Sequence, residues 1–230
     1  MSQQALMFAT YTNPLIVVDA ADFDGTDLMT RGAGFTDAAD SKTGILSFWA
    51  RLDGNDGATR QIIASATTVA GSTLRTRARF LLTSNLFTIS GFNAASSEIL
   101  TIPSASAYTA GATWYHFLSS WNLATASGTL YVNDVSDIGS PTLTDDTIDY
   151  TMADWGIAAS PAAGNPFSGC LAELYFAPGQ YLDFSLVSNR RKFISANGKP
   201  VHLGATGSLP TGTAPIVYQH LDDAEAVANF

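Results

Sequence analysis

TWYHFLSSWNLATASGTLYVND, residues 113–134, is the stretch of sequence that decides the fold. Apolar and aromatic residues occupy both alternating sets of positions over residues 114–121, so we expect a central strand that is covered on both faces. In residues 128–133, Leu130 and Val132 alternate with Tyr131, as expected of a strand. Asn133 and Asp134 tolerate the positive φ of a tight turn. The stretch therefore predicts two antiparallel strands, with His116 as a buried, hydrogen-bonded side chain rather than a ligand or a base.

Similar strand patterns recur along most of the chain, each bounded by turn-forming residues. Ten segments have this character: 15–18, 27–30, 45–52, 61–65, 78–92, 99–102, 114–121, 128–133, 148–158 and 171–176. So many short strands predict an all-β sandwich or barrel. One short helix is predicted near the C-terminus, at SLVSNRRKFIS, capped by Ser185 or Asp183 and ended by Asn197-Gly198.

We expect one domain with two parts. Residues 1–184 would form the sandwich, and residues 185–230 would form the short helix and a C-terminal strap that packs on the sandwich or on a neighbouring subunit. The strap is rich in Gly and Pro but keeps recurring apolar residues, which favours an ordered segment over a linker.

The chain is acidic and poor in charge. It carries a net charge of −9 with only 13% charged residues, so we expect no nucleic-acid partner, which would need an excess of Lys and Arg. No stretch is long and apolar enough for membrane insertion, and the first residues show no signal-peptide pattern. The one basic cluster, Arg75, Arg77 and Arg79, has the spacing of a single strand face. A solvated strand face or an ion-paired contact with another subunit is the simpler interpretation, and contact with an anion or an acidic glycan is the alternative.

Four segments in a fixed order carry a family resemblance: FDGTDLMTRG, SFWARLD, the W-x-H-F-x-x-x-W-N run into LYVND, and GCLAELYF. Together they resemble the laminin-G-like domains of the concanavalin-A-like lectin and glucanase superfamily, which implies an antiparallel β-sandwich of the jelly-roll type. The later stretch, NRRKFIS followed by GKPVHLGATGSLPTGTAPIVY, resembles a tail found on structural proteins of tailed bacteriophages and prophages.

The second resemblance implies a bacteriophage virion structural protein, acting as a capsid decoration, head-fibre or tail-associated module. Its localisation would be the virion, after assembly in the host bacterial cytoplasm, and its partners would be other virion proteins of the capsid or tail. Symmetric self-association as a homo-oligomer, for example a trimer, is expected because attachment points on virions are symmetric. The alternative function is a glycan-binding adhesion module that recognises host surface polysaccharide.

The sequence predicts no enzymatic activity, although the superfamily includes glucanases. Retaining hydrolysis needs two carboxyl groups about 5 to 5.5 Å apart, and Glu173 has no acidic residue at the alternate positions of its strand. We expect Glu173 to form a buried hydrogen bond or an ion pair, for example with an arginine. Cys170, the only cysteine, lies in the same apolar strand and is predicted to be a buried, unreactive thiol.

Calcium is the one cofactor that the resemblance implies, because many laminin-G-like domains hold it at one end of the sandwich. Asp24 and Asp27 are the candidate ligands, together with a second loop. Calcium needs six to eight oxygen ligands, and Asp-Gly pairs also occur in turns for conformational reasons alone.

Glycan binding would need an exposed aromatic platform. Trp155, Tyr108 and Tyr181 are the candidates because each neighbours turn residues, although a large aromatic residue can also seal the edge of a sandwich by packing. Trp49, Trp114 and Trp121 lie in strands and are predicted to belong to the core.

Overall fold

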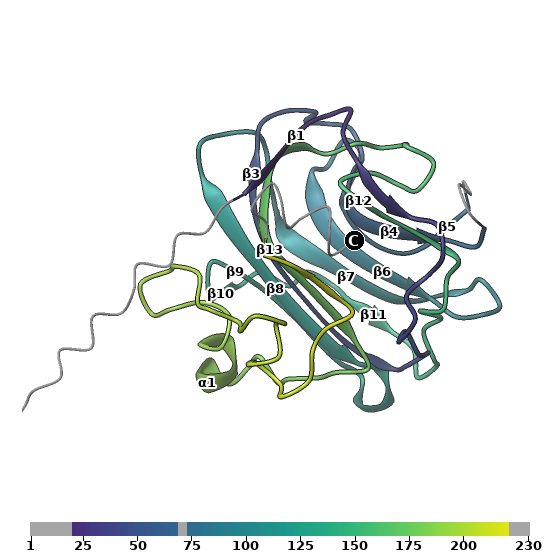
Figure 1. Ribbon diagram of the computed structural model, residues 1–230. Coiled ribbons are helices and arrows are strands. Elements are labelled where there is room, and N and C mark those ends of the chain that lie inside the picture. The colour runs from purple at the N-terminus through teal and green to yellow at the C-terminus, as the bar shows by residue number, and fades with distance from the viewer. Residues whose placement is uncertain (1–19, 69–72, 221–230) are drawn as a thin grey trace, which may run out of the picture.

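The computed structural model describes residues 20–68 and 73–220, which form two antiparallel sheets packed face to face (Figure 1). Sheet A contains, in spatial order, β1 (Ala21–Asp24), β13 (Ser168–Pro178), β3 (Thr43–Leu52), β8 (Trp114–Asn122), β9 (Ser127–Val132) and β10 (Val135–Ser136), with β14 (Val217–Gln219) also paired to β13. Sheet B contains β11 (Thr142–Leu143), β7 (Glu98–Ala107), β6 (Leu86–Phe92), β5 (Leu74–Phe80), β4 (Arg60–Ala66), β12 (Asp154–Ile157) and β2 (Met29–Arg31). The predicted all-β jelly-roll sandwich is confirmed.

Aromatic side chains from both sheets fill the space between the layers. Phe48 and Phe117 of sheet A stack with their ring centroids 4.9 Å apart, and both also contact Phe87 of sheet B. Each of these rings is at most 1% exposed. Burying a Phe side chain contributes about 1.5–3 kcal/mol, so this cluster is a main source of cohesion between the sheets.

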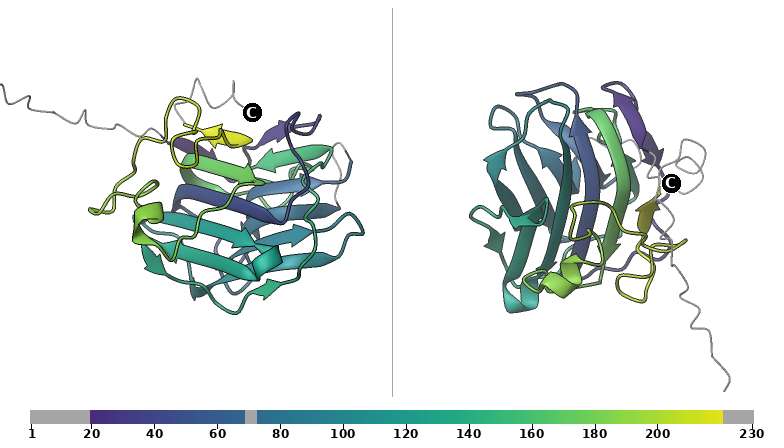
Figure 2. Two further views of the ribbon diagram at one scale, coloured as in Figure 1. Left: turned by 90° about the horizontal axis from the view of Figure 1, so that it is seen from below. Right: turned by 90° about the vertical axis from the view of Figure 1, so that its left-hand side faces the viewer.

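Sheet A is covered on both faces, as the pattern of residues 114–121 predicts. On its outer face, Leu118 packs with Phe184, Phe193 and Leu203 in a second apolar cluster. The segment after β13, which contains the helix α1 (Val187–Arg190), lies against this face (Figure 2). We call residues 198–219 the C-terminal strap. Its last part, β14, adds hydrogen bonds to β13.

One edge of β13 is completed by the two ends of the described chain. β1 pairs with residues 168–171, and β14 pairs with residues 174–176 of the same strand. Between them the strand is irregular, and Glu173 has a positive φ of 49°. Such a bulge redirects a side chain locally, and here it places Glu173 at the junction of β1 and β14.

Two predicted strands differ from the structure. Residues 78–92 divide into β5 and β6 because the chain turns at residues 81–85, where Thr83 and Asn85 have positive φ. Of residues 148–158, only those of β12 form a strand, while Ile148 makes an isolated bridge to Ser41. The predicted strand at 15–18 lies outside the described residues.

The predicted helix is much shorter in the structure. α1 has four residues, and its N-cap is Leu186, without a side-chain cap hydrogen bond. Asp183 instead accepts a hydrogen bond from the Ser185 backbone N–H, so neither predicted cap acts as one. The chain turns after Arg190 so that Phe193 can pack on sheet A, and tertiary packing thus outweighs helical propensity. No helix in the described part of the chain is long and apolar enough to cross a membrane.

Candidate functional site

The predicted aromatic platform is not assembled. Trp155 is completely buried and packs between Phe35 and Phe176, with ring centroids 5.2 and 5.6 Å away. Tyr108 is 6% exposed, and its hydroxyl donates a hydrogen bond of 2.6 Å to Asp137. Neither ring is available to stack on a sugar, so the prediction of exposure is wrong for both. Tyr181 is half-buried and remains a candidate.

A different pair of aromatic residues, Trp49 and Trp114, lines a cavity of about 470 Å³ on the outer face of sheet A. Ala172 lies on the same face, because it pairs directly with Trp49 across β13 and β3. The other lining residues come from the start of β1, the β9–β10 turn and the strap: Ala20, Asn133, Gly198, Lys199 and Pro200. The cavity therefore lies between sheet A and the strap.

The two tryptophans differ in exposure. Trp49 is 7% exposed, which confirms its predicted burial, and it stacks on His116 with ring centroids 4.7 Å apart. Trp114 is only half-buried, so its assignment to the core is wrong. The Arg51 guanidinium lies 5.8 Å from the centroid of the Trp114 ring. Trp114 thus presents aromatic surface at the rim, whereas Trp49 forms part of the floor.

His116 is the cross-strand neighbour of Trp49 and stacks beside it on the outer face of sheet A. It is 1% exposed, and its Nε2 lies 2.9 Å from the Ser47 hydroxyl, while its backbone N–H donates to the Asn133 side chain at 2.8 Å. Burial lowers the pKa of His116 to about 3, so the ring is neutral at physiological pH. The prediction of a buried, hydrogen-bonded histidine is confirmed.

Polar groups surround this apolar floor. Lys199 is exposed on the strap. Asn133 lies in the β9–β10 turn, where it and Asp134 have φ values of 50° and 68°, as the turn prediction requires. An aromatic floor with a few polar groups at its edge, in a cavity of about 300–1,000 Å³, is the usual composition of a small-molecule or sugar site. Sequence reasoning missed this site because its walls come from segments that are far apart in the chain.

The candidate calcium ligands have local roles in a turn. The Asp24 carboxylate accepts hydrogen bonds from the Thr26 backbone N–H at 2.8 Å and from the Thr26 hydroxyl at 2.7 Å. These bonds lower the pKa of Asp24. Asp27 accepts a bond of 3.3 Å from the Asp24 backbone N–H. The turn explains both carboxylates, and calcium binding stays a prediction.

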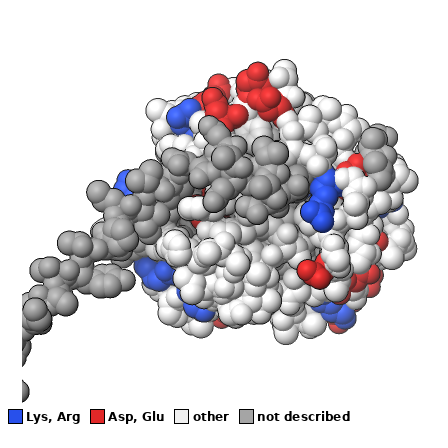
Figure 3. Space-filling model, in the orientation of Figure 1, with Lys and Arg blue, Asp and Glu red and all other residues white. Residues whose placement is uncertain are grey.

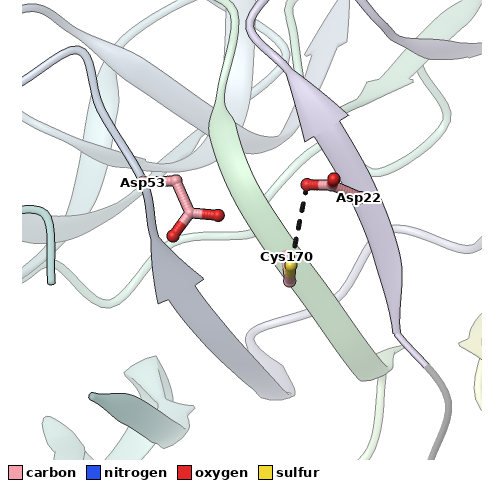
Figure 4. Close-up of side chains that lie close together, drawn as sticks. All are labelled: Asp22, Asp53 and Cys170. Atoms are coloured by element: carbon pink, nitrogen blue, oxygen red, sulfur yellow. Dashed lines mark hydrogen bonds between the residues drawn. The ribbon is translucent and has the colours of Figure 1, made fainter. Parts of the chain in front are cut away.

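Another group of potential metal ligands lies nearby on sheet A. Asp22 and Asp53 approach Cys170 from the strands on either side of β13 (Figure 4), and their ligand atoms lie within 4.8 Å of one another. The Cys170 thiol is 8% exposed and lies 3.6 Å from Asp22, and burial raises its pKa. Arg51 holds both oxygens of Asp53 at 2.9 and 2.8 Å. The guanidinium thus occupies the position from which a cation would approach Asp53, and the predicted buried thiol is confirmed.

The lone glutamate of β13 is enclosed by the strap. Glu173 is 4% exposed; it accepts a hydrogen bond from the Tyr218 hydroxyl at 3.0 Å, and its other oxygen lies 2.5 Å from Nδ1 of His220. The predicted buried hydrogen bond is confirmed, and its partners are Tyr218 and His220 rather than an arginine. Glu173 therefore links β13 to the end of β14.

Charge is unevenly distributed over the surface. The space-filling view shows a face that is mostly uncharged, with carboxylates gathered at the top, where β1 and β3 end (Figure 3).

The fold is similar to several solved structures at low sequence identity. It matches a SAP-like pentraxin from Limulus polyphemus with a TM-score of 0.51 and 14% identity, covering 73% of this chain and 79% of that chain. It matches domain 4 of an extracellular arabinanase from Geobacillus stearothermophilus, solved in complex with arabinotriose, with a TM-score of 0.52 and 13% identity, covering 74% and 75%. A Bacteroides ovatus protein proposed to bind carbohydrate matches with a TM-score of 0.51 and 12% identity; 69% of this chain and 42% of that one are covered.

No curated protein matches the chain in sequence. A family profile does match, over residues 28–178, which include most strands of both sheets. The match spans more than half of the chain and agrees with the sandwich topology. The chain therefore belongs to the laminin-G-type family of the concanavalin A-like lectin/glucanases superfamily.

Proposed function

We propose that this protein is a non-catalytic carbohydrate-binding module whose site is the cavity between Trp49, Trp114 and the strap. The observation that carries the proposal is the half-buried Trp114 ring at the rim of a cavity with a tryptophan floor. Sugars present apolar C–H faces that pack on aromatic rings, and hydroxyl groups that pair with polar side chains. Asn133 and Lys199 are placed to supply the polar contacts.

Structural relatives support this class of ligand. The arabinanase domain was solved with bound arabinotriose, which is a property of that domain. Its similarity to this chain concerns the fold, and the choice of carbohydrate for this chain rests on the tryptophan cavity itself. The same cavity would serve the recognition of host surface polysaccharide that the sequence suggests.

The non-catalytic part of the proposal rests on Glu173. One of its oxygens is engaged by Tyr218 of the strap and the other by His220, which directly follows the strap, and the side chain is 4% exposed. A glycosidase acid or nucleophile must instead face the scissile bond beside a second carboxyl group. Glu173 is better explained as a structural link between β13 and β14.

The test measures binding of immobilised neutral polysaccharides (glucan, arabinan, galactan and mannan) to the wild type and to Trp114→Ala. We expect at least one polysaccharide to bind, and Trp114→Ala to weaken that binding at least about tenfold, equivalent to about 1.4 kcal/mol. Trp114→Phe should retain most of the affinity, since it keeps an aromatic face.

Tyr181→Ala is the matched control, because Tyr181 is also half-buried but does not line the cavity. Unchanged affinity in Tyr181→Ala with a loss in Trp114→Ala supports the cavity. A loss of affinity in Tyr181→Ala with unchanged affinity in Trp114→Ala would instead place the sugar at Tyr181, as the sequence predicts. If none of the four polysaccharides binds, the proposal of a site for neutral glycans in this cavity is refuted.

A virion location is the second part of the proposal, and the resemblance of residues 189–218 to phage protein tails favours it. In this fold the same segment covers the outer face of sheet A and borders the cavity. A module of this kind, present as a symmetric homo-oligomer on the capsid or tail, would attach particles to host polysaccharide. Mass spectrometry of purified particles tests the location, and native mass spectrometry of the free protein at micromolar concentration tests the oligomer; a monomer would contradict self-association in solution.

A further inference from the structure

Arg77 and Arg79 form an unusual pair on the outer face of sheet B. They alternate along β5 with Ala78 and Phe80, which are buried in the core, so both guanidinium groups are on the opposite face from the core. Elsewhere in the described residues, Arg51, Arg60, Arg190 and Arg191 each pair with an aspartate. Neither Arg77 nor Arg79 has a carboxylate within 4.0 Å in that part of the chain. Two like charges thus lie two positions apart on one strand, and neither has a carboxylate in ion-pair contact.

Both guanidinium groups are also partly removed from water. Arg77 lies over the Phe92 ring at 5.3 Å, and its Nε is buried without a hydrogen-bond partner. Arg79 makes one long hydrogen bond, 3.3 Å, to the Ser90 hydroxyl. Burial and the charge of Arg77 lower the pKa of Arg79 to about 10, and burial lowers the pKa of Arg77 as well. Desolvated charge without a partner is unfavourable, so this arrangement is one that an anion would stabilise.

The strands on either side of β5 add two further polar groups. Gln61 of β4 and Thr88 of β6 are the direct cross-strand neighbours of Arg79, and neighbours in register share a sheet face. Gln61 is 1% exposed and Thr88 is 3% exposed, and the Gln61 Oε1 and Thr88 Oγ1 atoms lack hydrogen-bond partners. Buried polar groups are normally paired. A ligand that draws the Arg79 side chain outward would give these atoms access to new partners.

We propose that this face, centred on Arg77 and Arg79, is a second binding site that takes a carboxylate-bearing polysaccharide. A carboxylate accepts two parallel hydrogen bonds from a guanidinium fork, and alternate residues of a strand are about 7 Å apart, so two arginines can bind two carboxylates of one chain. Sugar hydroxyls can donate to Gln61 Oε1, which a simple anion without donors cannot. The net charge of −9 disfavours nucleic acid as the anion.

This site is independent of the tryptophan cavity, which lies on the outer face of the other sheet (Figure 2). Glu98 is the acidic residue whose charge affects the pKa of both Arg77 and Arg79. Its carboxylate accepts a hydrogen bond from the Thr101 hydroxyl. A surface with fixed cations would bind acidic glycans and release them at high salt.

The experiment compares binding of polygalacturonate by the full-length wild type, by Arg77→Gln/Arg79→Gln, and by Trp114→Ala. At low salt we expect the double variant to lose at least tenfold in affinity and Trp114→Ala to lose none. Neutral polysaccharide should show the opposite pattern, which separates failure of this site from failure of the cavity. Arg77→Lys/Arg79→Lys keeps the charge without the fork and should recover only part of the affinity.

The Tm of the double variant distinguishes a binding role of the two arginines from a structural one. Because the wild-type charges are unpaired, Arg77→Gln/Arg79→Gln should have an unchanged or higher Tm. The proposal is overturned if polygalacturonate does not bind at low salt, if the double variant binds it like the wild type, or if its Tm falls. Equal affinity of the Lys variant, or of heparin as a sulfated polysaccharide, would overturn the assignment of a carboxylate ligand.

Discussion

His116 predicts a specific loss of stability as the pH falls. In the unfolded chain a histidine gains a proton below its ordinary pKa of about 6.5, whereas folded His116 stays neutral down to a pKa of about 3 because it is buried. The unfolded state therefore binds more protons than the folded state over this range. Stability rises with pH in such a window, so it is complete above pH 6.5 and is lost progressively as the pH falls towards 3.

The size of this effect follows from the linkage relation. Each pH unit inside the window changes the free energy of unfolding by about 1.4 kcal/mol. Between pH 7 and pH 5 the wild type should therefore lose about 2 kcal/mol from His116 alone. Asp24, Asp53 and Asp134 have pKa values lowered from an ordinary 3.8, and the stability they contribute is lost only near and below that pH. The loss expected between pH 7 and pH 5 is thus separate from that of these carboxylates.

The assay is urea unfolding followed by tryptophan fluorescence at pH 7, 6 and 5, for the wild type and His116→Gln. Gln keeps a partner for the Ser47 hydroxyl but does not titrate. The variant should therefore be less stable than the wild type at pH 7. Between pH 7 and pH 5, however, its free energy of unfolding should fall by about 2 kcal/mol less than that of the wild type. His202→Gln is the control, since His202 is exposed and should keep the wild-type slope. Equal slopes in the wild type and His116→Gln would refute the reasoning.

Two further substitutions test the core between the sheets and the ion pair that holds the segment around α1. A Cβ on Gly44 would lie 2.3 Å from the ring of Trp121, which is completely buried, so Gly44→Ala should cost about 1–3 kcal/mol in urea unfolding. Gly111→Ala, where a Cβ would meet nothing within 4 Å, should stay within about 0.5 kcal/mol of the wild type; a similar loss in both would contradict the clash. Asp134 holds Arg190 at 2.6 Å, and Arg190 is 9% exposed, so Asp134→Asn should cost about 2 kcal/mol and speed hydrogen exchange around α1. Unchanged exchange there would argue against this ion pair as the anchor of the segment.

Several features could be predicted from sequence because they depend on neighbours along one strand. The two-sided burial of residues 114–121 and the turn at Asn133 follow from side-chain period and backbone preference. Cys170 and Glu173 were placed in a buried strand for the same reason. The partners of Glu173 could not be predicted, since Tyr218 and His220 reach it only because β14 pairs with the edge of β13.

The candidate site shows the limit of this reasoning. Proximity to turn residues favoured Trp155, yet this residue is in β12, whose inward face packs on Phe35 and Phe176. Trp114 belongs to a strand that is apolar on both faces and was assigned to the core. It is half-buried because the strap covers the outer face of sheet A only in part.

The sequence by itself determined the class of fold, since alternation along each strand specifies which side chains enter a sandwich core. It also placed Arg77 and Arg79 on one strand face. Only the tertiary structure decided which aromatic residues border a cavity and which charges lack partners. Exposure and pairing depend on segments that lie far apart in the chain: Trp49 and Trp114 line one cavity together with Pro200 of the strap, and no local pattern encodes that arrangement.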